Sequence, residues 1–445
     1  HFGSRHVGLS GCVSTFMSSL LIMCRMMSRI ALLVVGCWCQ ICSAHRNVVS
    51  FRAERQLRHH LWSKDCSSRY GSEMIEKYRN TIHTGCAHSG AKTQIQSSIV
   101  LHERVPFDNP RYTGEMKHVK LTSDGIGVLG CTPSTWLSSD KFQTHLDRLV
   151  FGAPLKPVDS QAWDQCSKAG NKALIQMPWD TNNLYEWFGD WVSLFETLEL
   201  LRWKPEDFQI FLIADEATDM HKRPFDEAWF LAFQSKVVRI GSYKSLFGGA
   251  GLCFAHVATV PMGGVSTITF AGGRGGEVQC ASSTVMGAAR FLSGLFLPAS
   301  TQGKRGGRGG KSAVLLLRKV STRKFVDDRE AVKAVSSALG QGWKLTPMSP
   351  EAMPNFADQI SPVSSADLLI GVHGAGMTLS LFLPRDAHLV EFFCEDRGPE
   401  NHHYMNLETM STGHHGQYHF SDRGSSCTVD TNTIQEAVAQ QTVQP

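Results

Sequence analysis

The feature that most constrains this sequence is the stretch ADLLIGVHGAGMTLSLFLPRDAHLVEFF at residues 366–393. Two apolar runs, 368–372 and 388–393, are too short for helices and are bounded by turn residues, a pattern typical of buried parallel strands. A tight His-Gly-Ala-Gly turn and a short apolar helix lie between them. The stretch therefore predicts two parallel strands joined by a short helix.

The glycine-rich turn is a candidate phosphate site. Gly371, Gly374 and Gly376 bring bare backbone to the first turn of the expected helix. Unpaired N–H groups and the positive end of the helix dipole meet there, which suits an anion, and His373 adds a side-chain donor. A glycine-rich corner that binds nothing has the same pattern, so both interpretations stay open on these residues alone.

The second half of the chain alternates short apolar strands with helices. The other expected strands are 172–177, 208–215, 236–240, 252–260, 313–317 and 343–346. The other expected helices are 183–201, 224–234, 280–295, 327–339 and 355–361. This alternation predicts α/β layers around mostly parallel sheets, with ligands bound beyond the carboxyl ends of the strands.

Composition shifts predict the domain boundaries. We expect one α/β domain over residues 166–302 and a second, doubly wound domain over 312–425, joined by the basic Gly-rich linker GKRGGRGGK at 303–311. Residues 45–165 are unassigned, although 120–130 alternates as strands do, and residues 426–445 form a tail. With a formal net charge of only +4 over 445 residues, the two Arg-Gly-Gly repeats indicate a solvated loop and no nucleic-acid partner.

The first 44 residues predict entry into the secretory pathway. From Met26, a basic start, an apolar run over 30–42 and small residues ending at Ala44 are typical of a signal peptide cleaved after Ala44. A signal anchor extending from Val13 is the alternative, although two arginines interrupt its apolar run. We expect the residues before Met26 to be untidy upstream sequence, and no lumenal retention tetrapeptide ends the chain.

The cysteines fit an oxidising compartment. Eight remain after this segment, at positions 66, 86, 131, 166, 253, 280, 394 and 427. Their scattered spacing predicts disulfides, whose pairing stays open, and lacks the close pairs of a metal site. An acidic cluster at 215–219 has the composition of a divalent-ion site, but a strand-end turn explains it equally well, so we predict no metal.

Two further groups of residues have chemistry that suits a nucleotide or an acceptor. Arg318, Lys319, Arg323 and Lys324 follow the strand 313–317, at the same end of the sheet as the glycine turn. Arginine suits bidentate phosphate contacts and lysine supplies a point charge. A solvated basic loop is the alternative.

The second group is a polar stripe on the helix 183–201. Glu186, Asp190, Ser193 and Thr197 share one face at i, i+4, i+7 and i+11. Repulsion between the two carboxylates would raise one pKa and favour a proton acceptor. The solvent face of an amphipathic helix is the alternative that the spacing by itself favours.

The motif at 369–391 resembles the donor-binding half of the family-61 glycosyltransferases, in which HGAG is followed by LFLP and by VE. Arg318, four residues and then Arg323-Lys324 resemble a second stretch of that family, with Asp327 where Asn is usual. Residues 183–190, NLYEWFGD, resemble its Asn-to-Asp helix, with Glu186 where His is common.

The resemblance covers residues 166–420 and implies a GT-B architecture, which is two Rossmann-like domains facing a cleft. It also implies an inverting transfer with no tightly bound cofactor and no required metal. In this scheme Arg318, Arg323 and Lys324 hold the pyrophosphate together with the turn of His373, Gly374, Ala375 and Gly376. Glu391 orients the ribose or the adjacent loop, and Glu186 or Asp190 is the catalytic base.

Within the family, the chain is most similar to the lumenal enzymes that attach N-acetylglucosamine to Ser or Thr of EGF-like domains. The features behind this are CEDR at 394–397, Cys-Phe at 253–254 and the spacing of Cys280 and Arg290. The expected donor is UDP-N-acetylglucosamine, and the expected partner is a secreted or membrane protein in the endoplasmic reticulum or Golgi lumen. Two alternatives remain: a xylosyl or arabinosyl transferase acting on polysaccharide, and a family member without activity, which the Glu186 substitution motivates.

Overall fold

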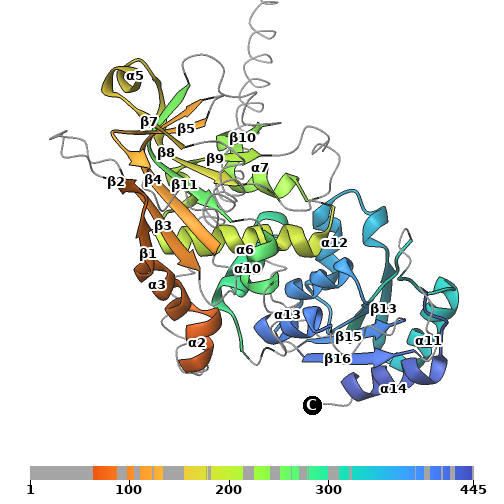
Figure 1. Ribbon diagram of the computed structural model, residues 1–445. Helices are drawn as coiled ribbons and strands as arrows, with labels where there is room; N and C mark the ends of the chain where they lie inside the picture. Colours follow the sequence, from red (N-terminus) through yellow and green to blue (C-terminus); the bar gives the residue numbers. More distant parts are fainter. Residues whose placement is uncertain are drawn as a thin grey trace, which may run out of the picture. The chain divides into compact units, whose positions relative to one another are not determined.

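The computed structural model describes these residues: 64–87, 98–104, 111–122, 125–133, 155–176, 178, 182–213, 225–240, 251–261, 263–269, 278, 280–298, 310–319, 323–385, 387–394, 401–411, 414–420 and 426–442. They all belong to one compact unit, Arg58–Pro445. The expected signal segment, the acidic cluster at 215–219 and most of the expected linker lie outside the described residues. Figure 1 shows two sheet-containing halves of this unit with helices between them.

The first half is built on a nine-stranded sheet. Seven strands follow the order β1-β3-β4-β11-β8-β9-β10. In addition, β5 pairs with β4, and β7 pairs with β5. Their bounds are β1 Ile82–Thr84, β3 Ile99–Arg104, β4 Arg111–Thr122, β5 Gly125–Leu129, β7 Leu155–Val158, β8 Ser167–Gln176, β9 Gln209–Ile213, β10 Val237–Ile240 and β11 Leu252–Val260. A separate pair is formed by β2, Cys86–Ala87, and β6, Thr132–Pro133.

The expected parallel strands of this half are confirmed, and antiparallel strands from the unassigned N-terminal region extend their sheet. Strands β8, β9, β10 and β11 are parallel, in the spatial order 3-2-1-4 of a Rossmann-type unit when numbered along the chain. The long strand β4 pairs antiparallel with β11, β3 and β5, and β1 pairs antiparallel with β3. These antiparallel strands come from residues 82–129, so the unassigned N-terminal region extends the same sheet.

The second half is built on a five-stranded, fully parallel sheet. Its order is β13-β12-β14-β15-β16, with bounds β12 Lys311–Leu316, β13 Trp343–Met348, β14 Leu368–Val372, β15 His388–Phe393 and β16 His414–His419. Numbered along the chain, this is the 2-1-3-4-5 order of a doubly wound domain. The bounds of β14 and β15 confirm the two expected strands around the glycine turn.

Most of the helices lie between the two sheets or cover the outer face of the second sheet. Their bounds are α2 Lys64–Tyr70, α3 Ser72–Asn80, α5 Ser160–Asp164, α6 Leu184–Leu201, α7 Glu227–Phe233, α10 Ser283–Phe296, α11 Asp328–Leu339, α12 Phe356–Val363, α13 His403–Ser411 and α14 Thr431–Thr442. Short 3-10 helices are η1 Pro205–Asp207, η3 Gln234–Lys236, η4 Gly263–Val265, η5 Pro350–Ala352 and η6 Ala375–Phe382. The apolar helix expected after the glycine turn is therefore a 3-10 helix.

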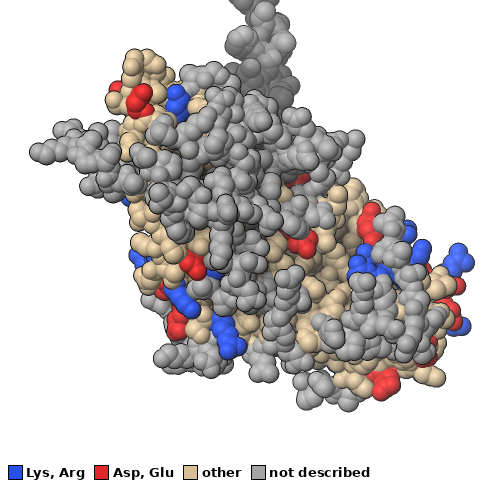
Figure 2. Space-filling view, in the orientation of Figure 1, with Lys and Arg blue, Asp and Glu red and all other residues tan. Residues whose placement is uncertain are grey.

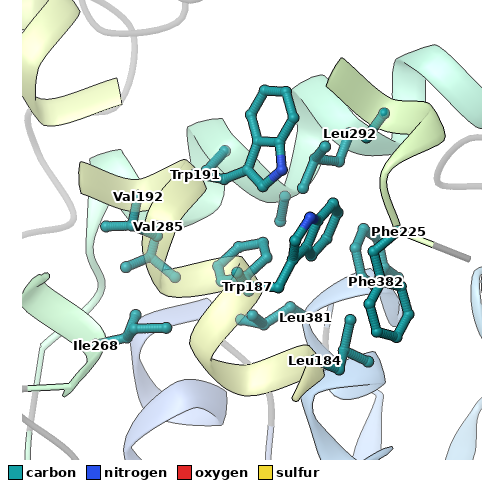
Figure 3. Close-up of a cluster of buried hydrophobic side chains, with 14 of the residues drawn as sticks. Leu184, Trp187, Trp191, Val192, Phe225, Ile268, Val285, Leu292, Leu381 and Phe382 are labelled. Carbon is teal, nitrogen blue, oxygen red and sulfur yellow. The ribbon is translucent and has the colours of Figure 1, made fainter. Parts of the chain in front are cut away.

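One apolar core joins the two halves, and α6 runs through its centre. Trp187 and Trp191 on α6 are fully buried, and Trp191 stacks on Trp229 of α7 with ring centroids 4.1 Å apart. Figure 3 shows the α6 side chains lying among those of α10 and η6, including Leu292 and Phe382. A second core covers the opposite face of the nine-stranded sheet, and a third lies under α11 and α14.

The expected disulfides are confirmed. Three pairs join Cys86 to Cys131, Cys166 to Cys253, and Cys394 to Cys427. Cys280 is also disulfide-bonded. None of the described helices is both long and apolar enough to cross a membrane.

Candidate functional site

The glycine turn and the first basic residue meet where the order of the five-stranded sheet reverses. The chain continues from β12 to β13 on one side, whereas β14 lies on the other side of β12. Doubly wound domains bind ligands at such a switch point, outside the carboxyl ends of the strands, which here are β12 and β14. Arg318 follows β12 and His373 follows β14, and the Arg318 Nη1 donates a hydrogen bond to the His373 carbonyl oxygen at 3.3 Å.

Gly374 allows Arg318 to lie over the turn. Its φ is +154°, and a Cβ added there would overlap the Arg318 guanidinium. A Cβ at Gly376 would have its nearest neighbour 3.9 Å away, which is ordinary contact, whereas at Gly371 it would lie 2.7 Å from the Met377 sulfur. Gly374 is therefore the glycine of this motif that the arginine requires, and Gly371 allows η6 to pack on β14.

The basic residues form a partly buried group at this end of the sheet. Burial lowers the pKa of Arg318, and Glu351, whose Oε1 is 3.6 Å from Nε, offsets part of that effect. Arg323 and Lys324 are half-buried, and the Lys324 carbonyl oxygen accepts the Cys427 N–H at 2.8 Å. On the face shown in Figure 2, Lys and Arg side chains gather over the region of α11 and β13.

His373 lies within a chain of polar side chains. Its Nδ1 is 2.5 Å from Glu391 Oε1, and its Nε2 is 3.0 Å from the Asn401 amide nitrogen. The other Glu391 oxygen accepts from His415 Nε2 at 2.9 Å, and His403 Nδ1 bonds to Asn401 Oδ1. Both ring nitrogens of His373 therefore have protein partners, so its predicted donor contact stays a prediction.

Glu391 is fully buried beneath the turn. Burial raises the pKa of its carboxyl, but the hydrogen bonds from His373 and His415 outweigh that effect and hold the pKa below its usual range. Both carboxylate oxygens serve the two histidines, so contact with a nucleotide ribose stays a prediction.

The polar stripe on α6 is buried, and its interpretation as a solvent face is wrong. Asp190, Ser193 and Thr197 are 0% exposed, and Glu186 is half-buried. Asp190 Oδ1 accepts the Gly263 N–H at 2.7 Å, at the carboxyl ends of β8 and β11, where the order of the first sheet reverses. The stripe therefore packs on η4, and the predicted role of Glu186 or Asp190 as a base stays a prediction.

The structure thus places the predicted residues in two groups, one at each switch point. Arg318, Arg323 and Lys324 lie with the glycine turn on the second sheet, and Glu186 and Asp190 lie on α6. Aromatic contacts connect α6 to α13, because the Tyr185 ring lies 5.1 Å from that of His403 and 6.0 Å from that of Tyr404. Among the described residues, no group of three His, Cys, Asp or Glu side chains could hold a metal ion.

Comparison with known proteins indicates the family to which this region belongs. Residues 183–390, which run from the N-cap of α6 to the third residue of β15, match the family model for glycosyltransferase 61. Residues 183–390 belong to the glycosyltransferase 61 family. This family-61 region contains the α6 stripe, the basic cluster and the glycine turn.

Curated relatives are similar over parts of the chain. Protein O-linked-mannose beta-1,4-N-acetylglucosaminyltransferase 2 of Canis lupus familiaris is 26% identical over 246 residues, which is 54% of this chain and 40% of that protein. The Homo sapiens protein of the same name is 26% identical over 245 residues. Beta-1,2-xylosyltransferase XAX1 of Oryza sativa subsp. japonica is 31% identical over 109 residues, 24% of this chain and 17% of that protein. The chain spans well under half the length of each of these relatives.

Among solved structures, E. coli heptosyltransferase WaaC with ADP aligns over 61% of this chain and 99% of that chain, with 9% identity and a TM-score of 0.30. So low a TM-score carries no argument about fold or function.

Two polar groups around the family-61 region were missed by sequence reasoning. Arg104 on β3 forms a buried ion pair with Glu196 on α6 at 2.6 Å, and Thr113, Thr197 and the Ser193 carbonyl oxygen take its remaining N–H groups. No signal marked Arg104, because its strand has no recognisable motif and its partner is 92 residues away.

The second missed group is a buried carboxyl on α13. Burial raises the pKa of Glu408 to about 8, and the nearby Ser380 hydroxyl of η6 partly offsets this effect. The pattern of apolar and polar residues did not predict α13.

Proposed function

We propose that this chain is an inverting glycosyltransferase that transfers N-acetylglucosamine from UDP-N-acetylglucosamine to a hydroxyl group of a protein acceptor. The observation that carries the proposal is Arg318 lying over Gly374 at the switch point of a doubly wound sheet, inside the family-61 region. A guanidinium beside the first N–H groups of a 3-10 helix suits the two phosphates of a nucleotide sugar.

In this proposal the two halves work as the two domains of a GT-B enzyme. The five-stranded half binds the donor: Arg318, Arg323 and Lys324 hold the pyrophosphate, and the backbone at 374–376 donates to it. These cations neutralise the charge that develops on the departing UDP, which is the role that a metal ion has in other transferases. The half that carries α6 holds the acceptor, and a single displacement inverts the anomeric carbon.

The acceptor class is proposed from similarity. Ser or Thr hydroxyls of EGF-like domains are the first candidate, and the O-linked-mannose relatives add a mannose attached to protein as a second. The rice xylosyltransferase favours a pentosyl transfer to polysaccharide as the alternative activity. The disulfides among the described residues fit an oxidising lumen of the secretory pathway for all of these activities.

The decisive experiment is a donor panel on the chain from His45 onward, secreted from a eukaryotic host. We expect turnover of UDP-N-acetylglucosamine in the presence of EDTA, and little turnover of UDP-xylose or UDP-arabinose. Turnover restricted to the pentosyl donors would support the alternative activity and contradict the proposed donor. UDP binding without transfer to EGF-domain, O-mannosyl or polysaccharide acceptors would instead indicate a family member without activity.

Variants test the donor site in the same assay. Arg323→Ala is expected to weaken UDP binding by at least about tenfold, equivalent to ~1.4 kcal/mol, because it removes a cation from the phosphate group. Lys344→Ala is the matched control, since Lys344 is an exposed cation at the amino end of β13, opposite the site. Equal affinities in both variants would show that the basic cluster does not hold the donor.

A further inference from the structure

His403 is the side chain at which the two halves meet beside the candidate site. It begins α13, and its ring lies against that of Tyr185 with an interplanar angle of 78°. Tyr185 directly precedes Glu186 on α6. An imidazole is therefore present next to this turn of α6, but it comes from α13.

The hydrogen bonds of the polar chain assign the protons of each ring. The Asn401 amide nitrogen can only donate, so His373 accepts at Nε2 and donates from Nδ1 to Glu391. Asn401 Oδ1 can only accept, so His403 carries its proton on Nδ1 and has a lone pair on Nε2. His403 is half-buried, and its Nε2 makes no hydrogen bond to a described residue.

Burial is the main reason that the His403 ring is neutral before it accepts a proton. Burial lowers the pKa of His403 to about 4, with His373 and His402 acting in the same direction and Glu391 opposing them. The other groups around it are Tyr185 on α6 and Tyr404 on α13, whose own pKa values burial raises, and both are neutral. A bound diphosphate brings negative charge, which would raise the pKa of His403 toward the working pH.

We propose that His403 is the catalytic base of the transfer, held in the required tautomer by Asn401, His373 and Glu391. This rests on the proposed function. His403 Nε2 takes the proton of the acceptor hydroxyl as the acceptor oxygen bonds to the anomeric carbon. The bond from that carbon to the β-phosphate oxygen breaks at the same time, and its electron pair leaves with UDP. The positive charge on His403 is stabilised through Asn401 and the buried Glu391 carboxylate, as in other base-and-orienter arrangements.

The first test replaces the base. His403→Ala is expected to lower kcat by about 10²–10⁴-fold, with UDP affinity nearly unchanged and with partial recovery of kcat on addition of imidazole. Thr409→Ala is the matched control, because Thr409 lies on the same helix and its hydroxyl donates to the Met405 carbonyl oxygen at 3.0 Å. A kcat close to that of wild type in His403→Ala, or a large loss in Glu186→Gln with no loss in His403→Ala, would overturn the proposal.

The second test shifts the pH dependence of kcat and leaves His403 in place. Asn401→Asp places a carboxylate at His403 Nδ1, so the acidic limb of the kcat profile should shift upward by about one pH unit or more. A purely structural role for Asn401 leaves that limb in place. An unmoved limb contradicts the proposal, and a wild-type protein that turns over no donor contradicts both this proposal and the proposed function. Wild-type turnover that survives His403→Ala contradicts this inference alone.

Discussion

The absence of a side chain at Gly374 allows the Arg318 guanidinium to lie against the glycine turn. A Cβ at Gly374 would overlap the Arg318 guanidinium, whereas a Cβ at Gly376 would have its nearest neighbour 3.9 Å away. Both glycines belong to the same short motif and look equivalent in the sequence. They differ in two ways, because only Gly374 has a positive φ, +154°, and only Gly374 lies against the guanidinium of Arg318, 56 positions earlier in the chain.

Gly374→Ala therefore has a specific expected effect. The new methyl group displaces Arg318, so UDP affinity should fall by at least about tenfold (~1.4 kcal/mol) while the fold is retained. Gly376→Ala is the matched control, and its affinity should stay within about threefold of wild type, measured by calorimetry in the same buffer. Similar losses in both variants would show that the turn binds through features other than the Arg318 position.

Among the elements, α6 has the most unusual environment. Most of its polar side chains, including Asp190 and Glu196, are buried together with its tryptophans, and none of its residues is fully exposed. The buried Arg104–Glu196 pair fixes the helix to β3, and the Thr267 hydroxyl satisfies the second carboxylate oxygen. Burial raises the pKa of Glu196 and Arg104 opposes that effect, so the ion pair depends on complete pairing.

Breaking this pair should destabilise the protein strongly. Glu196→Gln leaves Arg104 as an uncompensated buried charge, and we expect a loss of about 3–5 kcal/mol in the free energy of unfolding. Glu206→Gln, at an exposed carboxylate just beyond the same helix, is expected to change it by less than about 0.5 kcal/mol, as is usual for surface substitutions. Urea denaturation followed by tryptophan fluorescence measures both. A small effect of Glu196→Gln would mean that Arg104 readily finds solvent or another partner.

On the scale of the whole molecule, one disulfide lies at the amino ends of two strands of the first sheet, and another lies at the carboxyl end of a strand of the second sheet. Cys166 and Cys253 join the amino ends of β8 and β11, away from the carboxyl ends that carry Asp190. Cys394 follows β15 directly, and its partner Cys427 bonds through its N–H to the Lys324 carbonyl oxygen. The second disulfide therefore holds part of the basic cluster beside the glycine turn.

Removing each disulfide in turn should show which of the two affects UDP affinity as well as stability. The double variant Cys166→Ser/Cys253→Ser is expected to lose about 2–5 kcal/mol of stability with unchanged UDP affinity. Cys394→Ser/Cys427→Ser should also lose stability, but in addition it should weaken UDP binding because Lys324 is released. Thermal denaturation and UDP titration below the melting temperature distinguish the two. Equal UDP affinities would contradict the link between the second disulfide and the site.

Local patterns in the sequence determined the elements. Apolar runs bounded by turn residues predicted β11, β14 and β15 with their observed bounds, and Asp327 at the start of α11 accepts from the first N–H groups of the helix as expected. The motif around residues 369–391 also sufficed to indicate the family. These properties depend on neighbours within a few residues, so they can be read along the chain.

Only the tertiary structure decided what surrounds these elements. The antiparallel extension of the first sheet, the burial of the α6 stripe and the pairing of Arg104 with Glu196 depend on residues far apart in the sequence. Periodicity identifies a helix face but does not say whether solvent or another element covers it, which is why the solvent-face interpretation of α6 was wrong. The same holds for His403, whose place beside Tyr185 arises because the core packs α13 against α6 and η6.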